Sequence, residues 1–158
     1  MPNLIEGNIA TSSGRFAVVA ARFNHVVVDQ LVTGAVEALL QHGTADGDID
    51  VIRVPGCFEI PLVAQRLAQS KQYAAVICLG AVIRGETDHY DYVAGAVTDG
   101  VGQAALNTGV PCIFGVLTCD TVEQALRRAG PKSGNKGFEA ALAAIEMVNL
   151  LRKLPGIE

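Results

Sequence analysis

Short runs of apolar, largely β-branched residues alternate along this chain with longer segments of helical periodicity, and this alternation constrains the fold most strongly. The runs at 16–21, 49–54, 74–79 and 112–117 are flanked by Gly, Pro or Asp, as buried strands are. Strands that are apolar on both faces and are joined by helices pair in parallel, with helices covering the sheet on both sides. The pattern therefore predicts a four-stranded parallel sheet.

The segments between these runs have the spacing of helices. In residues 27–42 the apolar positions fall on one face, and Gly43 is a natural C-terminal stop. A short helix is expected after Asp120, with Glu123 three residues on as in a capping box. Further helices are expected at 61–69, 89–107 and 138–154. With right-handed crossovers, the alternating order predicts a three-layer α/β/α sandwich of flavodoxin-like type.

The length indicates a single domain. The 158 residues are close to the ~150 typical of one domain, and the chain contains no internal repeat or linker. Residues 1–14 precede the predicted core and are polar, with Ser and Gly. They are expected to form either an N-terminal arm or an extra strand at another sheet edge.

Composition excludes several classes of protein. Lys and Arg number 12 against 16 Asp and Glu, so a protein built mainly to bind nucleic acid or anionic lipid is not expected. The longest near-apolar run, 74–83, is far shorter than the ~20 residues of a membrane span, and the first residues lack a secretory pattern. The four cysteines show no C-x-x-C spacing, which favours reduced thiols and a cytoplasmic location.

Unusual residues follow three of the predicted strands. Residues 22–24, 55–59 and 84–89 lie where open α/β sheets bind ligands, beyond the carboxyl ends of the strands. Phe23 is suited either to stacking on a flat ligand or to packing as a helix staple. Glu59 is suited either to binding a ring with amide edges or to stabilising a helix N-terminus. Pattern alone does not decide between these alternatives.

The third of these loops carries an anion-binding pattern. A glycine followed by Thr87 and Asp88 at a helix start leaves free N–H groups that can hold an anion. His89 lies in the first turn, and its unperturbed pKa of ~6.5 suits proton transfer near neutrality. The alternative is a solvated histidine. A metal site of Asp88, His89 and Asp91 is disfavoured, because adjacent helical residues do not face each other.

A second cluster of basic residues lies in RRAGPKSGNKG, at 127–137. It contains Arg127, Arg128, Lys132 and Lys136 but fails the P-loop pattern, since no Ser or Thr follows the lysine. It is either a solvated basic turn or a phosphate-binding cluster, in which arginine binds bidentately. A loop between two helices need not reach the pocket formed by the three other loops. If Arg128 serves that pocket, a neighbouring subunit supplies it, and the small-residue helix at 89–107 suits subunit packing.

These motifs together resemble the lumazine synthase family. The motifs in order are RFN at 22–24, VPGCFEIP at 54–61, LGAVIRGETDHYDYV at 79–93, FGVLT at 114–118 and AGPKSGNKG at 129–137. Each is weak alone, whereas all five in register are specific, and the resemblance covers about residues 16–151. The chain departs from many relatives at Cys57, Pro131 and Ser133, where Ala, Thr and Ala are common.

The resemblance implies an enzyme of riboflavin biosynthesis. It would join 5-amino-6-(D-ribitylamino)uracil to 3,4-dihydroxy-2-butanone 4-phosphate through an imine, eliminate phosphate and close the lumazine ring. No metal or organic cofactor takes part. Phe23 matches the position that stacks on the pyrimidine. Positions that contact the pyrimidine and the ribityl chain are matched by Cys57, Phe58, Glu59, Ala81, Val82 and Ile83.

The resemblance also places the phosphate end of the site. Glu86 and Thr87 match the phosphate-binding turn, and His89 matches the residue that transfers protons. Phe114 and Arg128 match positions that the adjacent subunit contributes. A further basic residue near the phosphate is matched by Lys136.

Assembly is a further implication of the resemblance. Family members form homopentamers, and some form icosahedral shells of sixty subunits, which the uninterrupted GPKSGNKG string favours. A riboflavin synthase enclosed by such a shell is an additional expected partner. The alternative function is a non-catalytic lumazine- or flavin-binding or shell-forming relative. A generic flavodoxin-like FMN domain is disfavoured, because residues 22–24 replace the expected Ser/Thr-rich phosphate loop.

Overall fold

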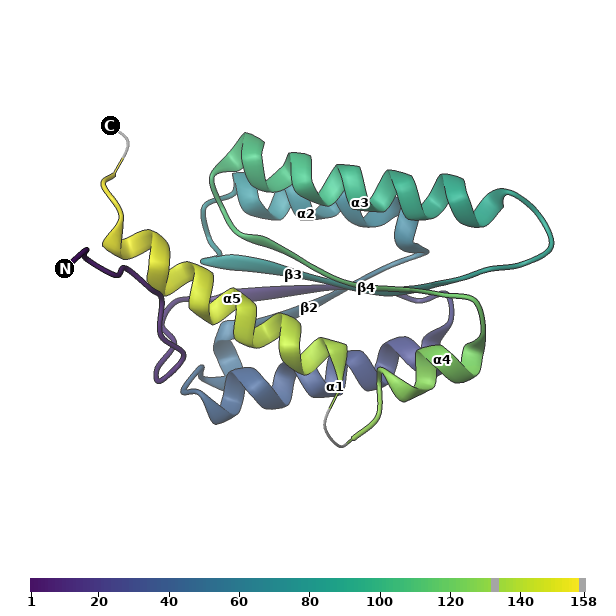
Figure 1. Cartoon of the computed structure of the whole chain (residues 1–158), viewed down its shortest axis with the longest axis horizontal. Helices are drawn as coiled ribbons and strands as arrows, with labels where there is room; N and C mark the ends of the chain where they lie inside the picture. Colours follow the sequence, from purple (N-terminus) through teal and green to yellow (C-terminus); the bar gives the residue numbers. More distant parts are fainter. Residues whose placement is uncertain (132–133, 157–158) are drawn as a thin grey trace.

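The computed structural model, which describes residues 1–131 and 134–156, contains the predicted parallel sheet (Figure 1). The strand order is β2-β1-β3-β4, and all three neighbouring pairs are parallel. The bounds are Phe16–Ala21 for β1, Ile49–Val54 for β2, Ala75–Ile83 for β3 and Cys112–Cys119 for β4. All side chains of β1 are buried, as expected for an inner strand with helices on both faces.

Helices cover both faces of the sheet and confirm the three-layer sandwich. Figure 1 shows α2 and α3 on one face and α1, α4 and α5 on the other. The helices are α1 (His25–Gln41), α2 (Ile60–Gln69), α3 (His89–Thr108), α4 (Val122–Arg127) and α5 (Lys136–Lys153), with short 3-10 turns at Asp46–Asp48 and Cys57–Glu59. Each face has its own apolar core, one under α1 and α5 and one under α2 and α3. No helix of the described residues is long and apolar enough to cross a membrane.

Two strands are longer than predicted. β3 continues past Leu79 to Ile83, and β4 continues past Leu117 to Cys119, because the two strands pair to their ends. Gly80 interrupts the apolar run in sequence, yet in the fold it is buried beneath the Cys57 side chain. The additional residues carry β3 to the edge where the candidate site lies.

The capping box of α4 is shifted by one residue from the prediction. Thr121, rather than Asp120, is the N-cap, and its partner is Gln124 rather than Glu123. The Thr121 hydroxyl accepts from the Gln124 amide at 3.2 Å, and Gln124 Oε1 accepts from the Thr121 amide at 3.4 Å. Both Asp and Thr are good N-caps, so the sequence offers two neighbouring N-cap positions for α4, Asp120 and Thr121. Pairing of β4 up to Cys119 leaves Asp120 to bind Arg84 instead.

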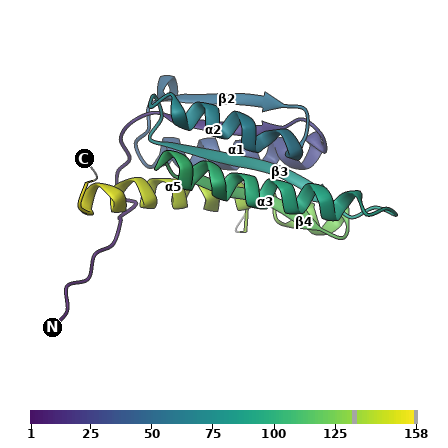
Figure 2. The same ribbon diagram turned by 90° about the horizontal axis from the view of Figure 1, so that it is seen from above.

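The segment at 1–14 is an arm and adds no strand to this sheet. It runs beside the C-terminal part of α5, and its first residues lead away from the domain (Figure 2). Asn149 Nδ2 donates to the carbonyls of Asn8 at 2.7 Å and Thr11 at 3.1 Å. Lys153 Nζ donates to the Glu6 carbonyl at 2.7 Å.

Candidate active site

The sheet opens between β1 and β3 at its carboxyl edge. Hydrogen bonding between the β1 and β2 segments continues past the end of β1. The amides of Arg22 and Phe23 donate to the carbonyls of Val54 at 2.8 Å and Pro55 at 3.1 Å. Pairing with β3 ends one residue before the end of β1, at Ala20 and Leu79. The chain connects β1 to β2 on one side and reaches β3 on the other, so this gap is the topological switch point where α/β sheets bind ligands.

Asn24 fixes the first loop at this gap. Its backbone is left-handed, with φ 63° and ψ 40°, a conformation that asparagine tolerates better than most residues. Its side-chain Nδ2 donates to the Ala81 carbonyl on β3 at 2.8 Å. The sequence places Asn24 in a candidate loop but gives it no role. The preceding residue, Phe23, has a ring that is 72% exposed, so it is not packed as a helix staple.

The turn after β2 presents an aromatic ring and a carboxylate. Phe58 is 60% exposed and Glu59 is exposed, whereas Cys57 is buried over Gly80. Glu59 is the N-cap of α2 but its side chain accepts no capping hydrogen bond, which leaves the carboxylate open to a ligand. Burial raises the pKa of the Cys57 thiol to about 11, with the Glu59 charge adding to the rise and the Ala81 main chain opposing it. Cys57 is therefore a neutral packing group at neutral pH.

The end of β3 offers main-chain groups to a ligand. Ala81 and Val82 are buried and Ile83 is half-buried, so their side chains pack inward. On the β1 side, the stretch beyond Leu79 is past the last strand pair. Main-chain groups alternate in direction along a strand, and the amides of Val76 and Arg84 bond on the β4 side, so Val82 also faces β4. The Ala81 main chain bonds Asn24 and Cys57, so on this edge the main chain of Ile83 can hydrogen-bond the amide-like edge of a flat ring.

The loop between β3 and α3 exposes main-chain amides at the start of a helix. Glu86, Thr87 and His89 are exposed, and α3 begins at His89. Within the described residues, 1–131 and 134–156, the main-chain amides of Gly85, Glu86 and Thr87 donate no hydrogen bond. Thr87 Oγ1 accepts a hydrogen bond from the His89 amide at 3.4 Å. Together with the positive end of the helix dipole, these free donors favour an anion. Across the described residues no group of three or more His, Cys, Asp or Glu side chains could hold a metal ion.

Arg84 braces this loop rather than facing solvent alone. Its guanidinium contacts Asp120 at 3.1 Å and Asp91 at 3.7 Å, and it lies over the Tyr90 ring at 4.2 Å from the ring centre. These contacts join the start of α3 to the end of β4. Arg84 therefore has a structural role at the start of α3.

The remaining predicted residues line a separate groove, here called the β4 groove. It has a volume of about 870 Å³ and lies along β4, the last strand of the sheet, beside α4 and the start of α5. Phe114, Arg128 and Lys136 all line it, together with Arg127, Gln124 and Glu139. The Lys136 amide donates to the Arg128 carbonyl at 2.7 Å, which holds the two basic residues next to each other. Lys132 and Ser133 lie outside the described residues.

The predicted site thus falls into two sets. The edge set comprises Phe23, Phe58, Glu59, Thr87 and His89, exposed beyond β1, β2 and β3. None of its members lines the β4 groove. Arg128 and Lys136, which suit phosphate, therefore line a groove to which the ring and the histidine that suit a heterocycle do not contribute.

Comparisons with known proteins agree on one family. The model of the family described as 6,7-dimethyl-8-ribityllumazine synthase matches residues 13–152. The chain is also 55% identical over 154 residues to a protein of Desulfotalea psychrophila that bears the same name. That match spans 98% of this chain and 99% of the relative.

Proposed function

The chain belongs to the 6,7-dimethyl-8-ribityllumazine synthase family, and on that premise we propose that its active site is completed by a second copy of the chain. The enzyme condenses 5-amino-6-(D-ribitylamino)uracil with 3,4-dihydroxy-2-butanone 4-phosphate, giving 6,7-dimethyl-8-ribityllumazine, phosphate and water. The observation that carries the shared site is the separation of the edge set from the β4 groove. The edge carries the pyrimidine-binding groups and the free amides of the phosphate turn, whereas the basic side chains suited to neutralising the phosphate, Arg128 and Lys136, line the β4 groove.

The edge set binds the pyrimidine. The exposed Phe23 ring stacks on the heterocycle, and the main chain of Ile83, beyond the last pair of β3 with β1, bonds its amide groups, with Ala81 and Val82 packed beside it. Phe58 and Glu59 contact the ribityl chain, with Glu59 accepting hydroxyl or ring N–H donors through its free carboxylate. Cys57 contributes main-chain contacts, since its thiol is buried against β3.

The phosphate lies between the two copies. The free amides at Glu86 and Thr87 hold it from one copy, and Arg128 and Lys136 of the neighbouring copy neutralise its charge. Phe114 of the neighbour supplies part of the apolar wall. This arrangement presents the ketone of one substrate to the amine of the other.

Orientation contributes most to the rate. The substrate amine attacks the ketone, water leaves as the imine forms, phosphate is then eliminated, and ring closure by the second nitrogen, with loss of a second water, gives the lumazine. Holding the two reactants together replaces a bimolecular encounter. His89, next to the bound phosphate at the start of α3, transfers protons in these steps rather than acting as a nucleophile. Arg128 and the free amides stabilise the leaving phosphate. No metal or organic cofactor is required.

Exposed apolar side chains support assembly. Leu62 on α2 and Tyr92 and Leu106 on α3 are 73%, 74% and 82% exposed, an apolar display typical of a protein interface. Gly95 and Ala96 on α3 allow close helix approach. We assign the chain to a homopentamer, with a sixty-subunit icosahedral shell as the higher assembly and riboflavin synthase as its enclosed partner. Four free cysteines suit a reducing compartment, so the enzyme is placed in the cytoplasm.

The test is a direct assay with both substrates. Purified protein is expected to produce fluorescent lumazine and release phosphate in step, and Arg128→Ala is expected to raise KM for the butanone phosphate. Binding of lumazine without turnover would instead support the non-catalytic alternative. An unchanged KM in the Arg128 variant would remove Arg128 from the phosphate site.

A further inference from the structure

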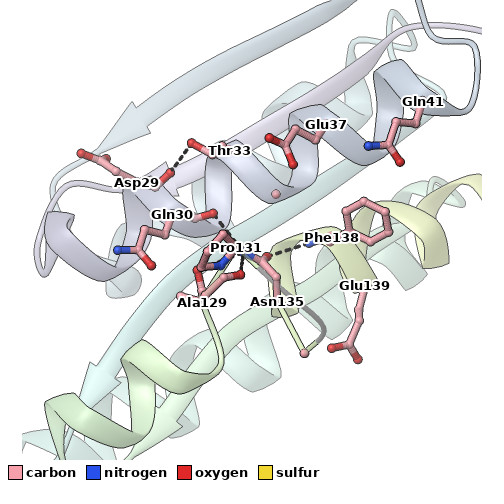
Figure 3. A pocket seen from close by; sticks show the side chains of 13 residues that line it. Asp29, Gln30, Thr33, Glu37, Gln41, Ala129, Pro131, Asn135, Phe138 and Glu139 are labelled. Atoms are coloured by element: carbon pink, nitrogen blue, oxygen red, sulfur yellow. Dashed lines mark hydrogen bonds between the residues drawn. The ribbon is translucent and has the colours of Figure 1, made fainter.

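Asn135 is a buried polar side chain at the centre of the segment that joins α4 to α5. It is 8% exposed, and among the described residues Thr44 is the other polar side chain classed as buried. Figure 3 shows Asn135 enclosed between α1 and the α4–α5 segment, with its amide directed at main-chain groups. Burying an amide is costly unless its hydrogen bonds are made, so its partners define what it does.

Both ends of the amide are bonded. Nδ2 donates to the carbonyls of Ala129 at 3.0 Å, Gly130 at 3.0 Å and Gln30 at 3.2 Å, so two hydrogens serve three acceptors. Oδ1 accepts from the Phe138 amide at 3.0 Å and caps α5. The cap needs the oxygen alone. Nδ2 has a separate structural role, because its hydrogen bonds connect the end of α4, the start of α5 and the side of α1.

The bonded segment carries the two basic residues of the β4 groove. Ala129 directly follows Arg128, and Asn135 directly precedes Lys136. The Lys136 amide donates to the Arg128 carbonyl at 2.7 Å, so the Asn135 bonds lie immediately behind the Arg128–Lys136 pair. Asn135 lines a second groove, between α1 and α5, which shares Gly134 and Glu139 with the β4 groove, but Asn135 is absent from the residues that line the β4 groove.

Helix α1 is shaped to receive this side chain. A Cβ at Gly34 would collide with Asn135 Oδ1 and lie 2.6 Å from its Cγ and 2.8 Å from its Nδ2. Glycine in a helix interior costs about 1 kcal/mol relative to alanine. The close approach of Asn135 accounts for a glycine at this position of α1.

We propose that Asn135 is a positioning residue for phosphate binding, which fixes Arg128 and Lys136 at the spacing that the phosphate of the second substrate requires. This inference rests on the proposed function of those two basic residues. It predicts that loss of the Nδ2 bonds weakens phosphate recognition even when the cap of α5 is kept.

The test compares three variants by steady-state kinetics. Asn135→Asp keeps a capping oxygen but replaces the donor with a carboxylate facing three carbonyls. Gly34→Ala displaces the Asn135 side chain by a clash. The mutated residue itself does not line the β4 groove, so it cannot contact the phosphate there directly. Asn149→Asp is the matched control, because Asn149 lies in the same helix and its Nδ2 also bonds main-chain carbonyls, those of Asn8 and Thr11.

The expected result is a difference between the two substrates. For Asn135→Asp and Gly34→Ala, KM for the butanone phosphate rises about tenfold or more, since small displacements of binding groups are costly. The inhibition constant for inorganic phosphate rises in parallel, while KM for the pyrimidine stays within about twofold of wild type. Asn149→Asp keeps wild-type values for both substrates.

Several results separate the possible failures. A wild-type KM for the butanone phosphate in Asn135→Asp or in a folded Gly34→Ala overturns the inference, as does an equal rise in Asn149→Asp. If Asn135→Asp does not fold, Gly34→Ala decides, because its collision is with a side chain, not with backbone, and the gain in helix propensity offsets part of the overpacking cost. If Arg128→Ala leaves KM for the butanone phosphate unchanged, the proposed phosphate site itself is wrong, whatever the Asn135 variants show.

Discussion

A methyl group added at Gly80 tests how closely the Cys57–Glu59 turn is packed onto β3. An alanine Cβ there would collide with Cys57 Sγ and lie 3.4 Å from Ile60 Cδ1 and 3.6 Å from Ala21 Cβ. Overpacking of this kind costs typically 1–3 kcal/mol, so we expect Gly80→Ala to lose about 2 kcal/mol. Cys57→Ala removes one buried atom of about methyl size and is expected to lose about 1 kcal/mol.

The double variant distinguishes packing from an unrelated effect. With the sulfur gone, the added methyl group fills its space, so we expect the double variant within about 1 kcal/mol of wild type and a coupling of about 2 kcal/mol. In thermal unfolding at one protein concentration, Gly80→Ala melts about 4–8 °C below wild type, and the double variant recovers most of that loss. KM for the pyrimidine follows the same order, because the clash displaces Glu59. Additive losses in the double variant would refute the packing of Cys57 over Gly80.

Three further predictions concern charge and proton binding. We expect Arg128→Ala to raise KM for the butanone phosphate, whereas His89→Ala lowers kcat moderately. A loss of turnover in the His89 variant larger than that in the Arg128 variant would contradict the assignment of His89 to proton shuttling. With its pKa raised to about 11, the Cys57 thiol is only ~0.1% ionised at pH 8, so alkylation followed by mass spectrometry should be at least about 100-fold slower than for a free cysteine. The Tyr73 hydroxyl at 2.6 Å, and then Arg15, hold the pKa of Asp50 below its usual range. The carboxylate therefore stabilises the fold above the unfolded pKa of ~3.9, and this stability is lost as pH falls through the lower folded value. Asp50→Asn should flatten the acid side of a stability–pH curve, and an unchanged curve would contradict the role.

The sequence predicts the architecture because its signals are local. The apolar runs and the helical periodicity each lie within one element, and parallel strands bring the residues after each strand to one edge. Phe23, Glu59 and His89 therefore fall on the same edge in the structure, as expected. Strand ends are less predictable, because Gly80 breaks the apolar pattern while its burial depends on Cys57, far away in sequence.

Residues that act through distant partners could not be predicted. Asn24 is bonded to Ala81 across 57 positions, and Asn135 is bonded to Gln30 across 105. Neither contact has a local sequence signal, since asparagine is common in turns in general. The β4 groove likewise depends on how α4 and α5 pack beside β4, although the topology already indicates that a loop between two helices need not reach the other three loops.

Subunit complementation tests the shared active site most directly. One variant, Phe23→Ala with His89→Ala, loses the edge set, and the other, Arg128→Ala with Lys136→Ala, loses the β4 groove. When the two are co-expressed in equal amounts, random assembly pairs two intact halves at about a quarter of the sites. We expect activity to return to about a quarter of wild type, with no recovery when separately assembled variants are mixed. Co-assembled protein whose activity does not exceed the mean residual activity of its two parents would contradict a site built from two copies of the chain.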